Sequence, residues 1–129
     1  MSFGALSKLY SNMLPQDTTY IKNELCNVNP RLVNSWLYSL TYLRNICAHY
    51  GRIYNTYFKA ISVKNSDKNK VINDRQVFVY ILAIKHLMPD SVIWNDYFIK
   101  LQSLFNKYNN YIDLKLLGFP KDWVSILSV

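Results

Sequence analysis

The chain has 129 residues, with 15 Lys and Arg against 8 Asp and Glu, and a formal net charge of +7. Its length is that of one domain, and a composition that is 50% apolar and 18% charged excludes an intrinsically disordered chain. Only 3 Gly and 4 Pro are present, which argues against a turn-rich β-sandwich or barrel. We therefore predict a single all-α domain over residues 1–129, a bundle of about five to six helices.

The first half of the chain predicts three helices. Apolar residues at helical spacing indicate one over 2–13 and a second, amphipathic one over 15–26. Pro30 opens the third, which is about 20 residues long and is the most regular. Gly51 is expected to end or distort it. Its apolar residues recur at steps of four, four, three, four and three, and predict one buried stripe of Leu32, Trp36, Leu40, Leu43, Cys47 and Tyr50.

The stretch that follows is polar before it turns strongly apolar. Residues 62–74 are rich in Lys, Asn and Asp, and predict an exposed basic loop. The nearly continuous apolar run over 76–88 also fits a buried strand, but its length favours a helix, with Asp74 as its N-cap. Pro89 ends that helix.

The C-terminal part predicts one more long helix and a less regular tail. Ser91 is the expected N-cap of an amphipathic helix over 91–109. After Gly118 and Pro120, the short apolar turn from Trp123 to Leu127 is expected to fold back on the bundle.

The sequence predicts neither a metal site nor a cofactor, and no membrane segment. Cys26 and Cys47 belong to no Cys/His array with zinc spacing. The N-terminus lacks the layout of a signal peptide, and no apolar run approaches the length of a membrane span. We expect a cytoplasmic protein with reduced thiols and no membrane partner.

Polar residues gather at the C-terminal end of the third helix. Arg44, Asn45, His49 and Arg52 fall close together there, and Asn55 follows. Asn45 and His49 are four positions apart and share one face, which Arg52 joins if the helix continues past its glycine. Arg44 and Asn45 lie outside the apolar stripe, so their side chains must face water, a partner subunit or a ligand.

These residue types suit metal-independent cleavage of a phosphodiester. A histidine can take and return a proton near neutral pH, and an arginine offers a charged fork to phosphate oxygens. His49 would activate a 2′-hydroxyl or protonate the leaving oxygen, and only RNA has that hydroxyl. The Arg-x4-His spacing by itself is weak evidence for a catalytic site, because an ordinary polar helix end produces it too. His86 lies on an apolar helix with no Arg, Asp or Glu positioned to make a site, and is expected to be structural.

The excess of positive charge is concentrated between Arg44 and Arg75. This segment carries a net charge of about +5, interleaved with Tyr50, Tyr54 and Tyr57. Such a pattern fits a phosphate-backbone footprint with stacking platforms, and it fits a solvated loop equally.

The segment SWLYSLTYLRNICAHYGRIYN resembles the signature of the Abi-like proteins, the abortive-infection family of bacteria. The opening FGALSKLY and the closing LLGFPKDW also resemble flanking segments of that family, so the resemblance runs over nearly the whole chain. Typical members are longer, and the chain resembles their C-terminal part, as a fragment or a short variant would. The matching positions are Trp36, Arg44, Asn45, Ala48, His49, Arg52 and Asn55.

The resemblance implies a fold and a site. The Abi-like family is placed in the HEPN superfamily, α-helical bundles in which an Arg-x4-6-His motif forms an RNase site, often where two copies meet. It implies an HEPN-like bundle in which Arg44 and His49 are catalytic, Asn45 positions them and a second subunit completes the site. The residues expected to bind RNA are Arg52, Asn55, Tyr50 and Lys59.

We therefore predict a homodimeric, metal-independent endoribonuclease of a phage-defence system, which acts as a toxin on cellular or viral RNA. An antitoxin or another regulatory partner would restrain it. The alternative is a non-catalytic RNA- or protein-binding dimerisation module, in which Arg44 and His49 are ordinary polar contacts. A third interpretation, a bare oligomerisation bundle, predicts no affinity for RNA.

Overall fold

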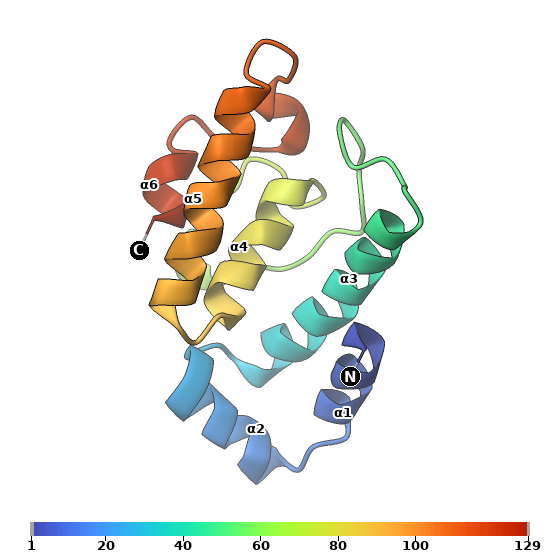
Figure 1. The fold of residues 1–129 in the computed structure, drawn as a ribbon. Helices are drawn as coiled ribbons and strands as arrows, with labels where there is room; N and C mark the ends of the chain where they lie inside the picture. Colours follow the sequence, from blue (N-terminus) through green and yellow to red (C-terminus); the bar gives the residue numbers. More distant parts are fainter. Residues whose placement is uncertain (1, 129) are drawn as a thin grey trace.

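The structure is a computed structural model that describes residues 2–128, and within them it contains helices and connections without any strand. The all-α prediction is confirmed, and the six α-helices are drawn in Figure 1. The helices are α1 (Phe3–Ser11), α2 (Pro15–Ile21), α3 (Pro30–Ala48), α4 (Val77–Leu87), α5 (Ser91–Lys107) and α6 (Trp123–Leu127). Three short turns accompany them: the π-helical η1 (Lys22–Cys26) and the 3-10 turns η2 (Asn65–Asp67) and η3 (Leu114–Leu117).

Helix α4 lies at the centre of the bundle. Figure 1 shows it between α3 and α5, with α1 beside α3 and α6 on the outer side of α5. Phe78, Val79 and Tyr80 of α4 are all 0% exposed. A helix that is apolar on every side is stable only when it is surrounded, which explains the nearly continuous apolar run of this segment.

Helix α3 has the predicted length, but its predicted buried stripe is partly wrong. Pro30 is its first residue, and Asn29 caps it by accepting a hydrogen bond from the Arg31 N–H (2.8 Å). Trp36 and Leu40 are buried as expected, whereas Cys47 is exposed and Tyr50 is 98% exposed. The fully buried positions of α3 end at Leu40, so the helix leaves the core before it ends.

The prediction of an exposed loop over 62–74 is also partly wrong, because the α3–α4 connection (residues 49–76) packs on the bundle. Asp67 in η2 is only 3% exposed. The Trp36 Nε1–H donates to the Ser62 carbonyl (2.7 Å), which ties the connection to α3. The Ile61 N–H donates to the Asp74 carbonyl (3.1 Å), so the connection also pairs with itself.

Two predicted N-caps are displaced by one or two residues. Gln76, not Asp74, precedes α4, and its Nε2 donates to the Leu116 carbonyl (3.0 Å). Asp90, not Ser91, caps α5, because its carboxylate accepts from the Val92 N–H (2.8 Å). Both displacements are of the size by which helix ends commonly vary, about one or two residues.

The C-terminal tail folds back on the bundle as predicted. The Trp123 ring meets those of Phe98, Phe105 and Phe119 edge to face. Leu127 is 0% exposed, and its carbonyl accepts a hydrogen bond from Trp94 Nε1 (2.7 Å). The tail is therefore part of the core.

Helix α2 is only loosely covered by the rest of the bundle. With η1 it spans the predicted range of 15–26, but none of its residues is buried. Tyr20 is 64% and Leu25 52% exposed, whereas Ile21 and Cys26 are partly buried against the core, so the apolar side of this segment is only partly covered. Among the described helices, none is long and apolar enough to cross a membrane.

Candidate functional site

The C-terminal end of α3 is closed by a tight turn that requires a glycine. The Tyr50 N–H donates to the Cys47 carbonyl (3.2 Å), and the Gly51 N–H donates to the Ile46 carbonyl (2.7 Å). These two bonds make a Schellman motif, in which Tyr50 takes the left-handed conformation at φ 58°. A Cβ at Gly51 would lie 2.9 Å from the Ile46 carbonyl oxygen, so the turn closes only without a side chain there. Because the helix ends at Ala48, the condition for Arg52 to join its face is not met.

Arg44, Asn45 and His49 are brought together at this end. Arg44 Nη1 donates to Asn45 Oδ1 (3.2 Å), and the His49 N–H donates to the Asn45 carbonyl (3.1 Å). Asn45 lies between the other two around the helix axis, since it is about 100° from Arg44 and about 40° from His49. All three side chains are exposed. Asn45 and His49 therefore share one face of the helix, and the fixed positive charge of Arg44 lies about 140° from His49 around the axis.

The residues predicted to bind RNA do not form one cluster. Tyr50 stands next to His49, and Arg52 Nε turns back to the Tyr54 carbonyl (2.7 Å). Asn55 takes a left-handed conformation at φ 50°, and its N–H donates to the Leu116 carbonyl (3.1 Å). The ammonium of Lys59 lies 4.9 Å from the centre of the Tyr38 ring.

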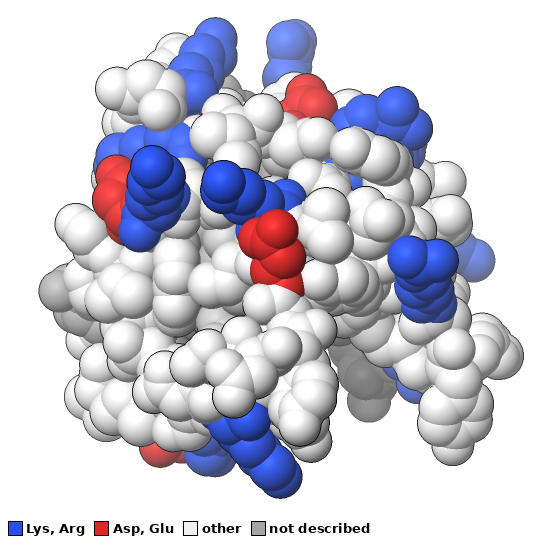
Figure 2. Space-filling model, turned by 90° about the horizontal axis from the view of Figure 1, so that it is seen from above, with Lys and Arg blue, Asp and Glu red and all other residues white. Residues whose placement is uncertain are grey.

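Part of the positive charge in the segment from Arg44 to Arg75 is engaged within the fold. Figure 2, which looks down on the molecule from the top of Figure 1, shows Lys and Arg side chains scattered among neutral ones, with acidic groups between them. Arg75 is used internally, because its Nε donates to the Phe58 carbonyl (3.0 Å). Lys70 pairs with Asp67 (3.3 Å). The charge is therefore divided between the end of α3 and the α3–α4 connection.

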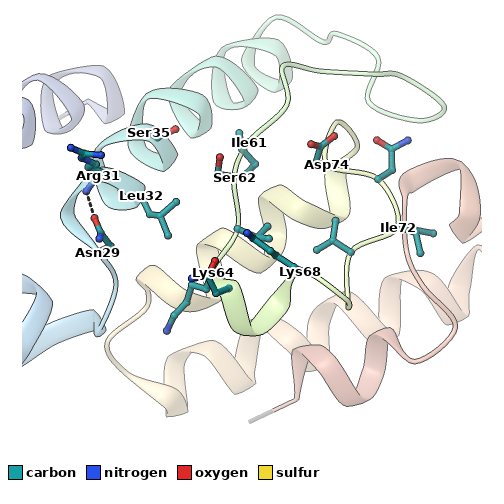
Figure 3. Close-up of a pocket in the computed structure, with 14 residues that line it drawn as sticks. Asn29, Arg31, Leu32, Ser35, Ile61, Ser62, Lys64, Lys68, Ile72 and Asp74 are labelled. Carbon is teal, nitrogen blue, oxygen red and sulfur yellow. Dashed lines mark hydrogen bonds between the residues drawn. The ribbon is translucent and has the colours of Figure 1, made fainter.

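A polar cleft lies beside the first half of α3, where the sequence indicated only a loop. It has a volume of about 1080 Å³ and is open to solvent. Figure 3 shows Arg31 at its rim on α3, and Lys68 extending from the connection into the space facing that helix. Lys64 is its third cation, and Asp74 is its only acidic side chain. We call this site the basic cleft.

His86 has an acidic partner, contrary to the expectation from the sequence. Its Nε2 lies 2.5 Å from Asp67 Oδ2, and its ring stacks on Trp36 with centroids 6.0 Å apart. Burial lowers the pKa of His86 below its ordinary value, against the opposing effects of the Asp67 hydrogen bond and charge. The charges of Lys64 and Lys85 also lower this pKa. The interpretation of His86 as a structural residue fits this packing.

No group of three or more His, Cys, Asp or Glu side chains converges on a metal-sized site within residues 2–128. Cys26 is half-buried and Cys47 is exposed, and both are free thiols.

Comparison with known protein families relates the first part of the chain to one of them. Residues 1–55 match the family model for Abi-like proteins. That range includes α1 to α3 and the whole motif from Arg44 to Asn55, whereas the closing segment LLGFPKDW lies outside it. No curated protein and no solved structure matches the chain significantly. The match supports a relationship to the Abi-like family through the first 55 residues, which cover less than half of the chain.

Proposed function

We propose that the chain is a metal-independent endoribonuclease of an abortive-infection system, and that it cuts RNA at the C-terminal end of α3. The observation that carries the proposal is the exposed group of Arg44, Asn45 and His49, in which Arg44 donates a hydrogen bond to Asn45. Exposed polar groups that no interior contact requires are available for a ligand. The match to Abi-like proteins supports the role in abortive infection.

Each of the three side chains has a distinct part in the proposed reaction. His49 accepts the proton of a ribose 2′-hydroxyl, whose oxygen then bonds to the adjacent phosphorus. The bond from phosphorus to the 5′-oxygen breaks, and that oxygen takes up a proton from the protonated second copy of the histidine in the dimer. Arg44 stabilises the charge on the phosphate oxygens, and Asn45 fixes the direction of the arginine fork through its 3.2 Å hydrogen bond. The products are a 2′,3′-cyclic phosphate and a 5′-hydroxyl.

The proposed active form is a homodimer. One chain supplies a single arginine and a single histidine at this surface, whereas the reaction needs a proton acceptor on one side of the phosphorus and a proton donor on the other. A two-fold pairing of the α3 ends would place two copies of each around one phosphate, as the HEPN resemblance implies. An antitoxin or regulatory partner that covered the same exposed end would block the site.

The test is cleavage of an end-labelled, mixed-sequence RNA in EDTA, with the His49→Ala protein purified in parallel to reveal contaminating nuclease. We expect only the wild type to cut, and the products to carry cyclic-phosphate and 5′-hydroxyl ends. An RNA with a 2′-deoxy group at the cleavage position should resist cutting. Cleavage of that RNA at the normal rate would show that the 2′-hydroxyl is not the nucleophile.

The dimer is tested in the same samples. Because both subunits contribute to the site, the rate per chain should rise with concentration in proportion to the dimer fraction measured by sedimentation. A rate per chain that stays constant while the protein dissociates to monomers would contradict the shared site.

The alternative is a non-catalytic RNA- or protein-binding dimerisation module. It is favoured by one observation: within residues 2–128, no hydrogen bond engages the His49 side chain with Arg44 or Asn45. A folded wild-type dimer that binds RNA and leaves it intact in the cleavage assay would establish this alternative.

A further inference from the structure

We infer that the exposed face of α3 is a track for single-stranded RNA, which runs from the basic cleft to the Arg44–His49 end. This inference rests on the proposed function for its ligand, since it names the form of RNA that the site accepts. It also adds binding residues outside the sequence motif.

The track is a continuous stripe of exposed side chains. They recur at steps of four, three, four, three and four, so all lie within about 40° of one line along the helix. With a rise of 1.5 Å per residue, the stripe is about 27 Å long. Its members are Arg31, Ser35, Tyr38, Tyr42, Asn45 and His49.

The cleft end of the stripe carries charge that is not neutralised within the described residues. Arg31 and Lys68 take part in none of the ion pairs found there, and both are exposed. Asp67 is engaged with Lys70 and His86, and Asp74, the one carboxylate that lines the cleft, stands against the three cations there. Such cations attract phosphate groups, and Arg31 and Ser35 belong both to the cleft wall and to the stripe.

The middle of the stripe offers flat aromatic surface beside a cation. Tyr38 is 63% and Tyr42 is 52% exposed, although both sit on the helix that carries the core residue Trp36. Lys59 holds its ammonium over the Tyr38 ring at 4.9 Å. Aromatic rings next to a positive charge bind unpaired bases by stacking and the backbone by attraction.

These features distinguish a single strand from a duplex. In a duplex the bases are stacked on each other and cannot lie on Tyr38 or Tyr42, so only the phosphates would contact the track. A stripe of about 27 Å offers room for several nucleotides of an extended strand, and sites for single strands hold about 4–16 nucleotides. We therefore expect the protein to bind single-stranded RNA more tightly than duplex RNA. The bound strand would extend along the track on one side of the cleaved bond.

The first arm of the test measures RNA binding with His49→Ala protein as the common background, which keeps the other five track residues and leaves the RNA uncut. Arg31→Ala combined with Lys68→Ala removes two cations, while Lys64 stays to hold the Asn27 carbonyl (3.1 Å). Loss of two phosphate contacts should weaken binding to a single strand about 20-fold at 0.1 M salt. It should also lower the slope of the logarithm of the binding constant against the logarithm of the salt concentration by about 1.4 in magnitude. Lys107→Ala with Lys121→Ala is the matched control, since both lysines are exposed, take part in none of the ion pairs found in the described residues and lie on α5 and the α5–α6 side.

The second arm tests the tyrosines. Tyr38→Ala should weaken binding of single-stranded RNA about tenfold and leave duplex binding unchanged. Tyr97→Ala is the control, because Tyr97 is 55% exposed and also lies under a lysine, Lys100, at 5.6 Å. A far-ultraviolet spectrum and an unfolding curve of each variant confirm that the folds are equal.

The outcomes separate the track from the proposed function. If both arms succeed and the wild type does not cut RNA, the track stands and the nuclease proposal fails. If the wild type cuts RNA but the track and control variants bind it equally, the track is wrong. Equal binding of duplex and single strand by the wild type would also overturn it.

Discussion

The two histidines of the chain lie in opposite environments. His49 is exposed at the end of α3, next to an arginine and an asparagine that have no interior role. His86 is half-buried on α4, between the Trp36 ring and the buried carboxylate of Asp67. The first has open access to a ligand, while the second is satisfied by the fold. Variants at the two sites should therefore separate activity from stability.

The largest expected effect is on the rate of cleavage at the His49 end. Arg44→Ala should reduce the rate about 100- to 1000-fold, because it removes the charge that stabilises the phosphate in the transition state. Its free energy of unfolding should match that of the wild type, since the side chain is exposed. Cleavage rate and urea unfolding are the two measurements.

Arg75→Ala is the matched control for that variant. Arg75 donates to the Phe58 carbonyl, so its loss should lower stability by about 1 kcal/mol and leave the chemistry intact. A stable Arg44→Ala protein with the wild-type rate would exclude Arg44 from the reaction.

The next largest effect is on stability at the His86 end. Asp67→Ala removes a carboxylate that is 3% exposed and leaves His86 without its partner. We expect a loss of about 1–3 kcal/mol in the free energy of unfolding, measured with urea at neutral pH. Asp67→Asn, which keeps an acceptor, should lose less. Equal stability of Asp67→Ala and the wild type would show that the pair does not anchor the connection.

The pH dependence of stability should also come from His86. Burial lowers its folded-state pKa below 6.5, so the unfolded chain binds the proton more readily. The free energy of unfolding should therefore fall as the pH drops below about 6.5, by at most about 1.4 kcal/mol per pH unit from this group. Urea unfolding between about pH 5 and 8 measures it. His86→Gln should flatten the curve in that window, and an unchanged slope in the variant would assign it to other groups.

The smallest effect concerns the turn that carries His49. Tyr50 is held at φ 58°, which costs a residue with a side chain about 1–2 kcal/mol. Tyr50→Gly should raise the free energy of unfolding by about 0.5–1 kcal/mol, after the greater freedom of glycine in the unfolded chain is counted. Tyr111→Gly is the control, because Tyr111 is 82% exposed and is not among the positive-φ residues. A loss of stability in Tyr50→Gly would show that the turn is not strained.

Local patterns in the sequence predicted most helices but not the contacts between distant segments. The bounds of α3 follow from Pro30, the apolar spacing and Gly51, all of which act within the helix itself. The extent to which α3 is buried cannot be predicted in this way. Its last buried residue is Leu40, and the apolar spacing contains no information on where the neighbouring helices end. For that reason Cys47 and Tyr50 keep the apolar spacing of the helix but are exposed to solvent.

The site was predicted to the extent that it is local. Arg44, Asn45 and His49 are close because one helix carries them, which spacing alone reveals. The pairing of Asp67 with His86 joins the connection to α4. The composition of 62–74 had instead predicted that this stretch is exposed. The basic cleft needs the connection to fold against α3. The proposed track does have a signal in the sequence, because the polar and aromatic positions from Arg31 to His49 recur with the helical period.

The most direct measurement is the cleavage rate of wild type, His49→Ala and His86→Ala on one RNA in EDTA, together with the free energy of unfolding of each protein. We predict that His49→Ala loses about 100-fold or more of the rate at unchanged stability. We predict that His86→Ala loses stability and, where it is folded, keeps its rate. A folded His49→Ala protein that cuts RNA as fast as the wild type would contradict the assignment of the active site to the end of α3.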